Sequence, residues 1–260
     1  MNNMYSILVI YNKKVIESPT YQFIKNEKCI QCIVCDNSTM DMNNKEIVEQ
    51  DGYTYLSMDG NAGLSKAYNK ALDFIQSINK EMDGYVILLD DDTLLTDEYI
   101  TEVKRCMHFC SDIFLPIVRD ELGIMSPCLV QDEVISRVEQ KVDINAYEKQ
   151  DLSGINSGML IRLDVFKDYR YDEHLFLDIV DHYINKEMKE KNKIIQIMNV
   201  EIQQNFSANS NEKESAKNRF KIFKKDSQYY FKKKKNYKYV VGKRKIRLFL
   251  QYTDVSFLGL

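Results

Sequence analysis

Residues 84–93 read GYVILLDDDT, an unbroken apolar run followed by three consecutive carboxylates. The run from Tyr85 to Leu89 is typical of a strand that is buried on both faces. Three adjacent acids resist burial, so as purely structural residues they would be solvated loop residues or helix caps. Alternatively, they lie at the carboxyl edge of a central parallel strand, where open α/β sheets bind ligands, and hold a divalent cation against a phosphorylated substrate.

Around this strand, strand and helix patterns alternate along the chain. Strand patterns occur at residues 5–11, 29–35, 53–56, 113–118, 124–130, 159–163 and 193–200. Helix patterns occur at residues 19–24, 64–75 and 99–107, and a further helix is expected to end near residue 192. This alternation predicts an α/β protein with a parallel sheet and right-handed crossovers. Residues 131–153 are polar without a clear pattern, and we expect them to form a long loop.

The chain of 260 residues is long enough to bury the core of one α/β domain, with or without a C-terminal appendage. No apolar run approaches the roughly 18 residues that span a bilayer. The run from Met4 to Tyr11 is too short for a signal-peptide core and favours a first strand. Six cysteines fit reduced thiols. These features predict a cytoplasmic protein.

The net charge of −3 conceals a strongly basic segment. Residues 213–247 carry 15 Lys and Arg against two acids, Glu214 and Asp226. Aromatic residues are interleaved with these lysines, among them Phe220, Phe223, Tyr229, Tyr230 and Phe231. The segment is interpreted either as a helical pair packed on the main domain or as a surface that docks on an anionic membrane. We expect no nucleic-acid binding, because no recognised motif accompanies the charge.

Four stretches in a fixed order give the chain a family resemblance. They are VCDNS at 34–38, GNAG at 60–63 with Ala67 and Asn69, LDDD at 89–92, and NSG at 156–158 followed by 171–173, 175–178 and Asp181. With these motifs the chain resembles the inverting glycosyltransferases of family 2, bacterial enzymes of the GT-A fold, and particularly their rhamnosyltransferase-like members. The resemblance covers residues 4 to 205, roughly.

The resemblance implies an α/β GT-A fold with a Rossmann-like, mostly parallel central sheet flanked by helices and a basic helical C-terminal extension. The catalytic domain is expected at residues 1–205, with a nucleotide-sugar-binding half at about 1–95 and an acceptor-binding half at about 96–205. Residues 206–260 are expected to form the basic aromatic extension.

The resemblance also implies a donor site for a UDP- or dTDP-sugar. Departure of the diphosphate builds negative charge, which Mn²⁺ or Mg²⁺ can neutralise, and such hard cations are held by carboxylates together with substrate phosphates. Matching the motifs residue by residue assigns the metal to Asp92, the ribose to Asp90 and the nucleotide or sugar to Asp91. Asp36 is expected to hydrogen-bond the base. The turn from Gly60 to Gly63 is expected to close the pocket, with Asn61 and Gly63 as its contributing residues.

An acceptor hydroxyl needs a base to take its proton as it attacks the anomeric carbon. The resemblance assigns this role to Asp181, with Asp178 as the alternative because three residues' spacing puts it on nearly the same helical face. Alternatively, Asp178 and Asp181 only cap or line the first turn of a helix, where negative charge interacts favourably with the helix dipole. Ser157 and Gly158 are expected beneath the acceptor, with His182 as a further acceptor contact.

The chain departs from the family pattern after its last expected strand. Many relatives have a histidine there that approaches the diphosphate or metal, whereas residues 202–207 read IQQNFS. The implied function is hexosyl transfer (EC 2.4) to a saccharide or lipid-linked acceptor in the synthesis of capsule, O-antigen or exopolysaccharide, at the inner face of the cell membrane. The alternative is a catalytically inactive nucleotide-sugar-binding or partner protein of the same fold.

Overall fold

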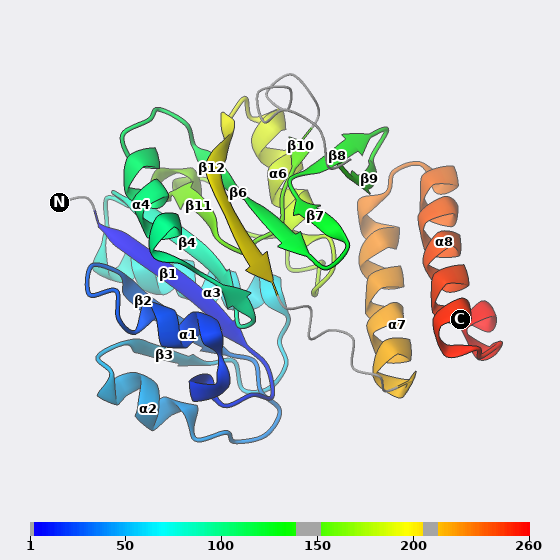
Figure 1. The fold of residues 1–260 in the computed structure, drawn as a ribbon, viewed down its shortest axis with the longest axis horizontal. Coiled ribbons are helices and arrows are strands. Elements are labelled where there is room, and N and C mark those ends of the chain that lie inside the picture. The colour runs from blue at the N-terminus through cyan, green and yellow to red at the C-terminus, as the bar shows by residue number, and fades with distance from the viewer. Residues whose placement is uncertain (1–2, 139–151, 205–212) are drawn as a thin grey trace.

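The computed structural model describes residues 3–138, 152–204 and 213–260, and shows a central sheet flanked by helices (Figure 1). Nine strands form the sheet: β1 (Met4–Ile10), β2 (Gln31–Asp36), β3 (Thr54–Ser57), β4 (Tyr85–Asp90), β5 (Thr93–Leu94), β6 (Ile113–Asp120), β7 (Gly123–Ser126), β11 (Met159–Arg162) and β12 (Ile195–Gln204). Their order is β3-β2-β1-β4-β11-β6-β12-β5, with β7 paired to β6.

The first four strands are parallel neighbours, because β1 pairs in parallel with both β2 and β4, and β2 with β3. The second half of the sheet is mixed: β11 runs antiparallel to β4 and β6, and β12 runs parallel to β6. The carboxyl ends of β1, β2, β3 and β4 therefore meet at one edge of the sheet, the position at which open α/β sheets bind ligands. The expected α/β architecture with a mostly parallel sheet is confirmed.

Apolar cores cover both faces of the sheet. In β4, Val86 and Leu88 join one core while Ile87 and Leu89 join the other, because successive side chains of a strand point to opposite faces. All four are fully buried. The continuous apolar run at residues 85–89 is thus explained by burial on both faces, as its pattern predicted.

Helices pack on each face through their own apolar stripes. The helices are α1 (Pro19–Ile24), α2 (Asn44–Gln50), α3 (Leu64–Ile78), α4 (Asp97–Cys106) and α6 (Val180–Glu190). Residues of α3 and α6 belong to the core around Leu88, whereas residues of α1, α2 and α4 belong to the core around Leu89. The sequence patterns predicted all of these helices except α2. That helix begins at Asn44 and buries little apart from Asn44 and Val48.

The strand expected at 124–130 is wrong as a single element. It is divided into β7 and β8 (Cys128–Gln131), which belong to different sheets. Pro127 lies between them and has no N–H to continue a ladder. The second sheet also contains β9 (Val134–Arg137) and β10 (Leu152–Ser153), so the loop expected at 131–153 is wrong at these positions. The remainder of that loop, 139–151, lies outside the described residues.

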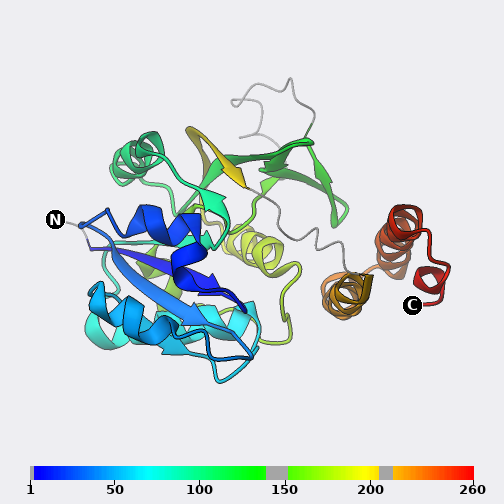
Figure 2. The ribbon, with the colours of Figure 1, turned by 60° about the horizontal axis from the view of Figure 1, so that its bottom comes forward.

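The C-terminal extension contains α7 (Lys213–Tyr230), α8 (Lys234–Tyr252) and α9 (Ser256–Gly259), so the expected helical pair is present. Figures 1 and 2 both show α7 and α8 side by side at one side of the domain. Four of the five aromatic residues noted in the basic segment are buried in an apolar cluster with Ile179: Phe220, Phe223, Tyr230 and Phe231. The fifth, Tyr229, is half exposed and donates a hydrogen bond to Asp172 at 2.6 Å. The expected boundary between residues 205 and 206 lies outside the described residues.

Leu88 offers a direct test of the two-sided burial of β4. Leu88→Ala should lower the free energy of unfolding by about 2–5 kcal/mol, because it leaves a cavity among fully buried neighbours. Urea unfolding measures the change. Leu122→Ala is the matched control, since Leu122 is 80% exposed and the same truncation there should change stability by less than about 0.5 kcal/mol. Equal unfolding midpoints for the two variants would contradict the structure.

Candidate active site

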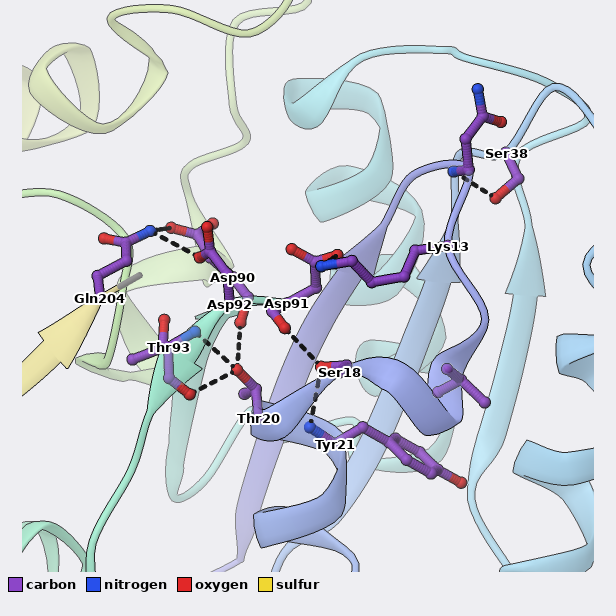
Figure 3. Close-up of polar contacts among 12 residues, drawn as sticks. Lys13, Ser18, Thr20, Tyr21, Ser38, Asp90, Asp91, Asp92, Thr93 and Gln204 are labelled. Atoms are coloured by element: carbon purple, nitrogen blue, oxygen red, sulfur yellow. Dashed lines mark hydrogen bonds and ion pairs between the residues drawn. The ribbon is translucent and has the colours of Figure 1, made fainter. Parts of the chain in front are cut away.

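The acidic stretch forms a tight turn between two strands. Because β4 ends at Asp90 and β5 begins at Thr93, Asp91 and Asp92 make the turn between them. The start of α1 holds this turn from below, as Figure 3 shows. Ser18 Oγ donates to the Asp91 carbonyl at 2.7 Å, and Thr20 Oγ1 lies 2.7 Å from the Asp90 carbonyl oxygen. The backbone that carries the three carboxylates is therefore anchored by side chains about 70 residues away in sequence.

The three carboxylates do not point the same way (Figure 3). Asp91 pairs with Lys13 Nζ at 2.7 Å. Asp90 and Asp92 instead share the side-chain amide of Gln204, whose Nε2 donates to Asp92 at 2.9 Å and to Asp90 at 3.2 Å. Ser157 Oγ also donates to Asp90. Asp90 and Asp92 therefore share one hydrogen-bond donor, whereas the Asp91 carboxylate points toward Lys13.

Asp90 and Asp92 bring two carboxylates together at the end of β4, where the protein partly excludes water from Asp90. Burial raises the pKa of Asp90 to about 6, the neighbouring carboxylates of Asp92, Asp181 and Asp91 also raise it, and the hydrogen bond from Ser157 acts in the opposite direction. A carboxylate whose charge is disfavoured by burial and like-charged neighbours gains stability from a cation. Asp181, from the start of a different element, is thus among the carboxylates that act electrostatically on Asp90.

The donor set at this turn fits a hard divalent cation. Asp90 and Asp92 offer carboxylate oxygens, and Mg²⁺ or Mn²⁺ in phosphate-transferring sites is held by one or two carboxylates plus substrate oxygens. Burial, together with the neighbouring carboxylates, raises the pKa of Asp90, and a bound cation would offset both effects. Within residues 3–138, 152–204 and 213–260, no three His, Cys, Asp or Glu side chains are grouped so that they could hold a metal.

The expected nucleotide side of the site lies at the end of β2. The carboxylate of Asp36 is buried and accepts hydrogen bonds from Asn44 Nδ2 at 2.9 Å and from Tyr55 Oη at 3.2 Å. Asn37 holds the glycine turn: its Oδ1 accepts from Ala62 N at 3.2 Å. Asn61 lies in that turn with an exposed side chain. The structure brings Asp36 and the glycine turn to one edge of the sheet, and their contact with a nucleotide stays a prediction.

Gly63 is the point where this turn meets another loop. Its φ of +90° favours glycine, and a Cβ there would lie 2.7 Å from the carbonyl oxygen of Phe176. The same carbonyl accepts the N–H of Leu64, the first residue of α3, at 2.7 Å. The absent side chain at Gly63 therefore allows the loop before α6 to pack against the glycine turn.

Asp181 and His182 occupy the first turn of α6. The Asp181 carboxylate is half-buried and accepts from His182 N at 2.8 Å, and His182 Nδ1 lies 2.7 Å from Ser153 Oγ. Burial raises the pKa of Tyr68 well above its usual range, and Asp90 and Asp181 act in the same direction. The phenol of Tyr68, which comes from α3, is therefore near both carboxylates.

The premise that gave Asp178 a place on the helical face of Asp181 is wrong. The helix begins at Val180, and Ile179 before it has a φ of +67°, which turns the chain before the helix starts. Asp178 lies upstream of this turn and pairs with two arginines of the extension, Arg219 at 3.3 Å and Arg244 at 3.6 Å. As the alternative base, Asp178 stays untested.

Ser157 and Gly158 lie behind the acids. Ser157 is fully buried, and its hydroxyl is engaged by Asp90. Gly158 donates its N–H to Leu88 at 2.9 Å and accepts from Tyr99 Oη at 2.7 Å. Both residues thus support the end of β4, and contact with an acceptor stays a prediction for them.

Sequence reasoning missed the roles of Gln204, Tyr68 and Asn37. Gln204 lies within the stretch where many relatives have a histidine, so the sequence indicated that this position matters. Nothing in the sequence indicated that its amide contacts two carboxylates. Tyr68 belongs to the helical pattern of α3 and had no signal of its own. Residues 205–207 of the same stretch lie outside the described residues.

No helix in the described parts of the chain is both long enough and apolar enough to cross a membrane.

Three solved structures that match this chain are described by their identity, coverage and TM-score. A Bacillus anthracis protein described as a glucose-1-phosphate thymidylyltransferase has 13% identity and a TM-score of 0.48, over 75% of this chain and 85% of that chain. HddC from Yersinia pseudotuberculosis has 13% identity and a TM-score of 0.45, over 76% and 90%. A protein from Desulfovibrio desulfuricans G20, described as a nucleotide-diphospho-sugar transferase, has 10% identity and a TM-score of 0.41, over 97% and 99%.

No curated protein sequence gives a significant match to this chain. The family model for glycosyl transferase family 2, however, matches residues 7–170, which is more than half of the chain. The match spans the glycine turn, the acidic turn and the NSG stretch, the features whose geometry is described above. The chain belongs to glycosyl transferase family 2.

Proposed function

We propose that this protein transfers a hexose from a UDP- or dTDP-sugar donor to a hydroxyl of a saccharide or lipid-linked acceptor, with inversion at the anomeric carbon. The observation that carries the proposal is that Asp181, at the start of α6, acts electrostatically on Asp90 at the end of β4, where Asp90 and Asp92 share the amide of Gln204. The acids at the end of β4 would act on the leaving diphosphate, and Asp181 would take the proton of the attacking hydroxyl. Family membership supports glycosyl transfer as the reaction class.

On the donor side, Asp92 would hold Mn²⁺ or Mg²⁺ together with donor phosphate oxygens, and Asp90 beside it would contact the ribose. When bound, the cation supplies positive charge that stabilises the departing diphosphate. Gln204 fixes the orientation of both carboxylates through its amide N–H groups. Asp91 is neutralised by Lys13, so it is suited to accept hydrogen bonds from the nucleotide or sugar.

On the acceptor side, Asp181 accepts the proton of the attacking hydroxyl. Its half-buried carboxylate lies in the first turn of α6, and a carboxylate is one of the side chains that act as general bases. Inversion requires direct displacement, in which the base activates the hydroxyl on the face of the sugar opposite the departing diphosphate, and we assign that position to Asp181. His182 lies beside it, in hydrogen-bond contact with Ser153, and would contact the acceptor. We assign the acceptor to bacterial surface polysaccharide synthesis at the inner face of the cell membrane, on the resemblance alone.

A nucleotide-sugar-binding protein without transferase activity is the second candidate. Gln204 stands in the stretch where many relatives carry a histidine, and its amide supplies no charge. The Asp36 carboxylate is also occupied by Asn44 and Tyr55. A screen of nucleotide sugars for enzyme-dependent hydrolysis of the donor separates the two candidates, because only a transferase releases the free nucleoside diphosphate.

Asp181→Asn tests the base. The amide keeps the size of the side chain but cannot accept a proton, so turnover should fall by roughly 10²-fold or more while donor affinity hardly changes. Initial rates with the donor found in the screen, together with calorimetry of donor binding, measure both quantities.

Two further variants serve as controls for Asp181→Asn. Glu190→Gln removes an exposed carboxylate from the far end of the same helix and should leave turnover unchanged. Asp178→Asn should cost less turnover than Asp181→Asn and should also lower stability, because it removes the partner of Arg219 and Arg244. Wild-type turnover in Asp181→Asn with an inactive Asp178→Asn would transfer the role to Asp178.

Asp92→Ala tests the donor side. Donor binding that depends on Mn²⁺ or Mg²⁺ should be lost, because the substitution removes the carboxylate assigned to the cation. Calorimetry with and without the cation measures it, and circular dichroism checks the fold. Asp97→Ala is the matched control, since Asp97 is an exposed acid five residues further along the chain. Unchanged cation-dependent affinity in Asp92→Ala would remove this residue from the role.

The extension also presents an outward surface suited to anionic lipid. Three apolar side chains at helical spacing on α8 are exposed: Tyr239 by 59%, Ile246 by 56% and Leu250 by 68%. Lys243 and Arg247 are exposed on the same helix. Exposed apolar groups flanked by cations are typical of helices that lie in a membrane interface. We propose anionic phospholipid as the partner of this surface.

Vesicle binding tests this surface. The protein should bind phosphatidylglycerol-containing vesicles more tightly than pure phosphatidylcholine vesicles, and added salt should weaken binding, because each cation near the surface contributes about 1 kcal/mol that is screened beyond about 8 Å. Ile246→Ser with Leu250→Ser should weaken binding at least roughly tenfold. Leu122→Ser, an exposed position elsewhere, is the control. Equal binding to both vesicle types, or to neither, would leave the extension only its packing role.

A further inference from the structure

A buried carboxylate of the extension binds the loop that leads into α6. Asp226, on α7, is completely buried and accepts three consecutive backbone N–H groups: Phe176 at 3.1 Å, and Leu177 and Asp178 at 2.9 Å each. Successive backbone N–H groups that converge on one anion form a strong and directional contact. Asp226 is one of only two acids within the basic segment 213–247. Its carboxylate faces the main domain, to which all three of these hydrogen bonds run.

The opposite side of this loop is bonded to the start of α3. Leu64 N donates to the Phe176 carbonyl at 2.7 Å, and Ser65 Oγ donates to the Leu175 carbonyl at 2.7 Å. The backbone of Phe176 is therefore held on both sides, through its carbonyl by the residue that follows the glycine turn and through its N–H by Asp226. The loop joins the expected nucleotide side of the site to the extension.

The next two residues carry the constraint to the base. The Asp178 carboxylate is largely buried between Arg219 and Arg244, and the guanidinium of Arg244 lies 4.0 Å above the ring of Phe223. Ile179, with its positive φ, is buried against the aromatic residues of the extension. The helix that carries Asp181 begins at the following residue, Val180. Every residue from 176 to 179 is thus held by α7 or α8.

We propose that Asp226 is a positioning residue for the transfer reaction: by binding the N–H groups of residues 176–178 it holds the start of α6 so that Asp181 faces the donor. The proposal rests on the proposed function of Asp181. It makes the C-terminal extension a working part of the active site, beyond its lipid-facing surface. A base displaced by about 1 Å can lose roughly 10²-fold in rate, so a loop held by three bonds to one carboxylate is a sensitive point.

Asp226→Asn tests the proposal, because the amide keeps the shape but presents an N–H donor to backbone N–H groups that need an acceptor. Turnover per donor-binding site should fall at least about tenfold, with donor affinity within about threefold of wild type. Calorimetry counts the donor-binding sites, so a loss of folded protein does not imitate the effect. Hydrogen exchange of the amides of residues 176–178 should become faster at the same time.

Asp254→Asn is the matched control, since Asp254 is the acid that binds Lys213, Lys217 and the N–H of Ser256 within the same extension and contacts no part of the loop. It should leave turnover per site and exchange at 176–178 unchanged. If Asp226→Asn does not fold, Arg219→Gln replaces it, because Arg219 is half exposed and holds the same loop through Asp178. It should cause a smaller change of the same kind.

Unchanged exchange and turnover in Asp226→Asn, or equal losses in the Asp254→Asn control, would overturn the proposal. Failure of the proposed function has a different signature. The wild-type protein would then transfer no sugar from any donor, while the exchange of residues 176–178 would still report whether Asp226 holds the loop. Faster exchange without any loss of turnover per site would show that the contact is only structural, which also overturns the positioning role.

Discussion

The carboxylate of Asp90 loses water at the end of β4 while two further carboxylates, Asp92 and Asp181, lie close to it. This electrostatic cost is why the pKa of Asp90 rises to about 6, and the surroundings of the turn act to offset it. Ser157 and Gln204 donate hydrogen bonds to the pair, and Lys13 neutralises Asp91. These donors come from widely separated parts of the chain. The sheet must therefore be complete before the acids can be held at its edge.

The same edge explains how the rest of the molecule is arranged. The glycine turn after β3 is held by Asn37, and the loop before α6 packs against Gly63 because no side chain stands there. That loop is bonded in turn to Asp226 of the extension. The start of α3, the loop before α6 and the extension are thus joined by hydrogen bonds through the backbone of Phe176. Phe220, Phe223, Tyr230 and Phe231 of the basic segment belong to this packing, whereas α8 presents lysines and a few apolar side chains outward.

Particular elements show where sequence patterns succeeded. The apolar run before Asp90 predicted a strand buried on both faces, and alternate residues do join different cores. Short or interrupted elements were missed: β5 has two residues, α2 buries little, and Pro127 divides an apolar run between two sheets. Asp178 was placed on the face of Asp181 by counting residues along a helix. Helical spacing has no meaning before the helix begins, and the positive φ of Ile179 could not be foreseen from a β-branched residue.

The sequence by itself determined the α/β class, the acids at the end of the central strand and the family to which the chain belongs, because hydrophobic period and short motifs are local properties. It also determined that residues 213–247 form a strongly basic segment, with 15 Lys and Arg against two acids, in a chain whose net charge is −3. Only the tertiary structure decided which acids share a neighbour, that Gln204 joins Asp90 to Asp92, and that Asp226 binds the loop before α6. These contacts join residues separated by about 50 to 114 positions, so no local pattern encodes them, and packing of the sheet and its helices brings them together.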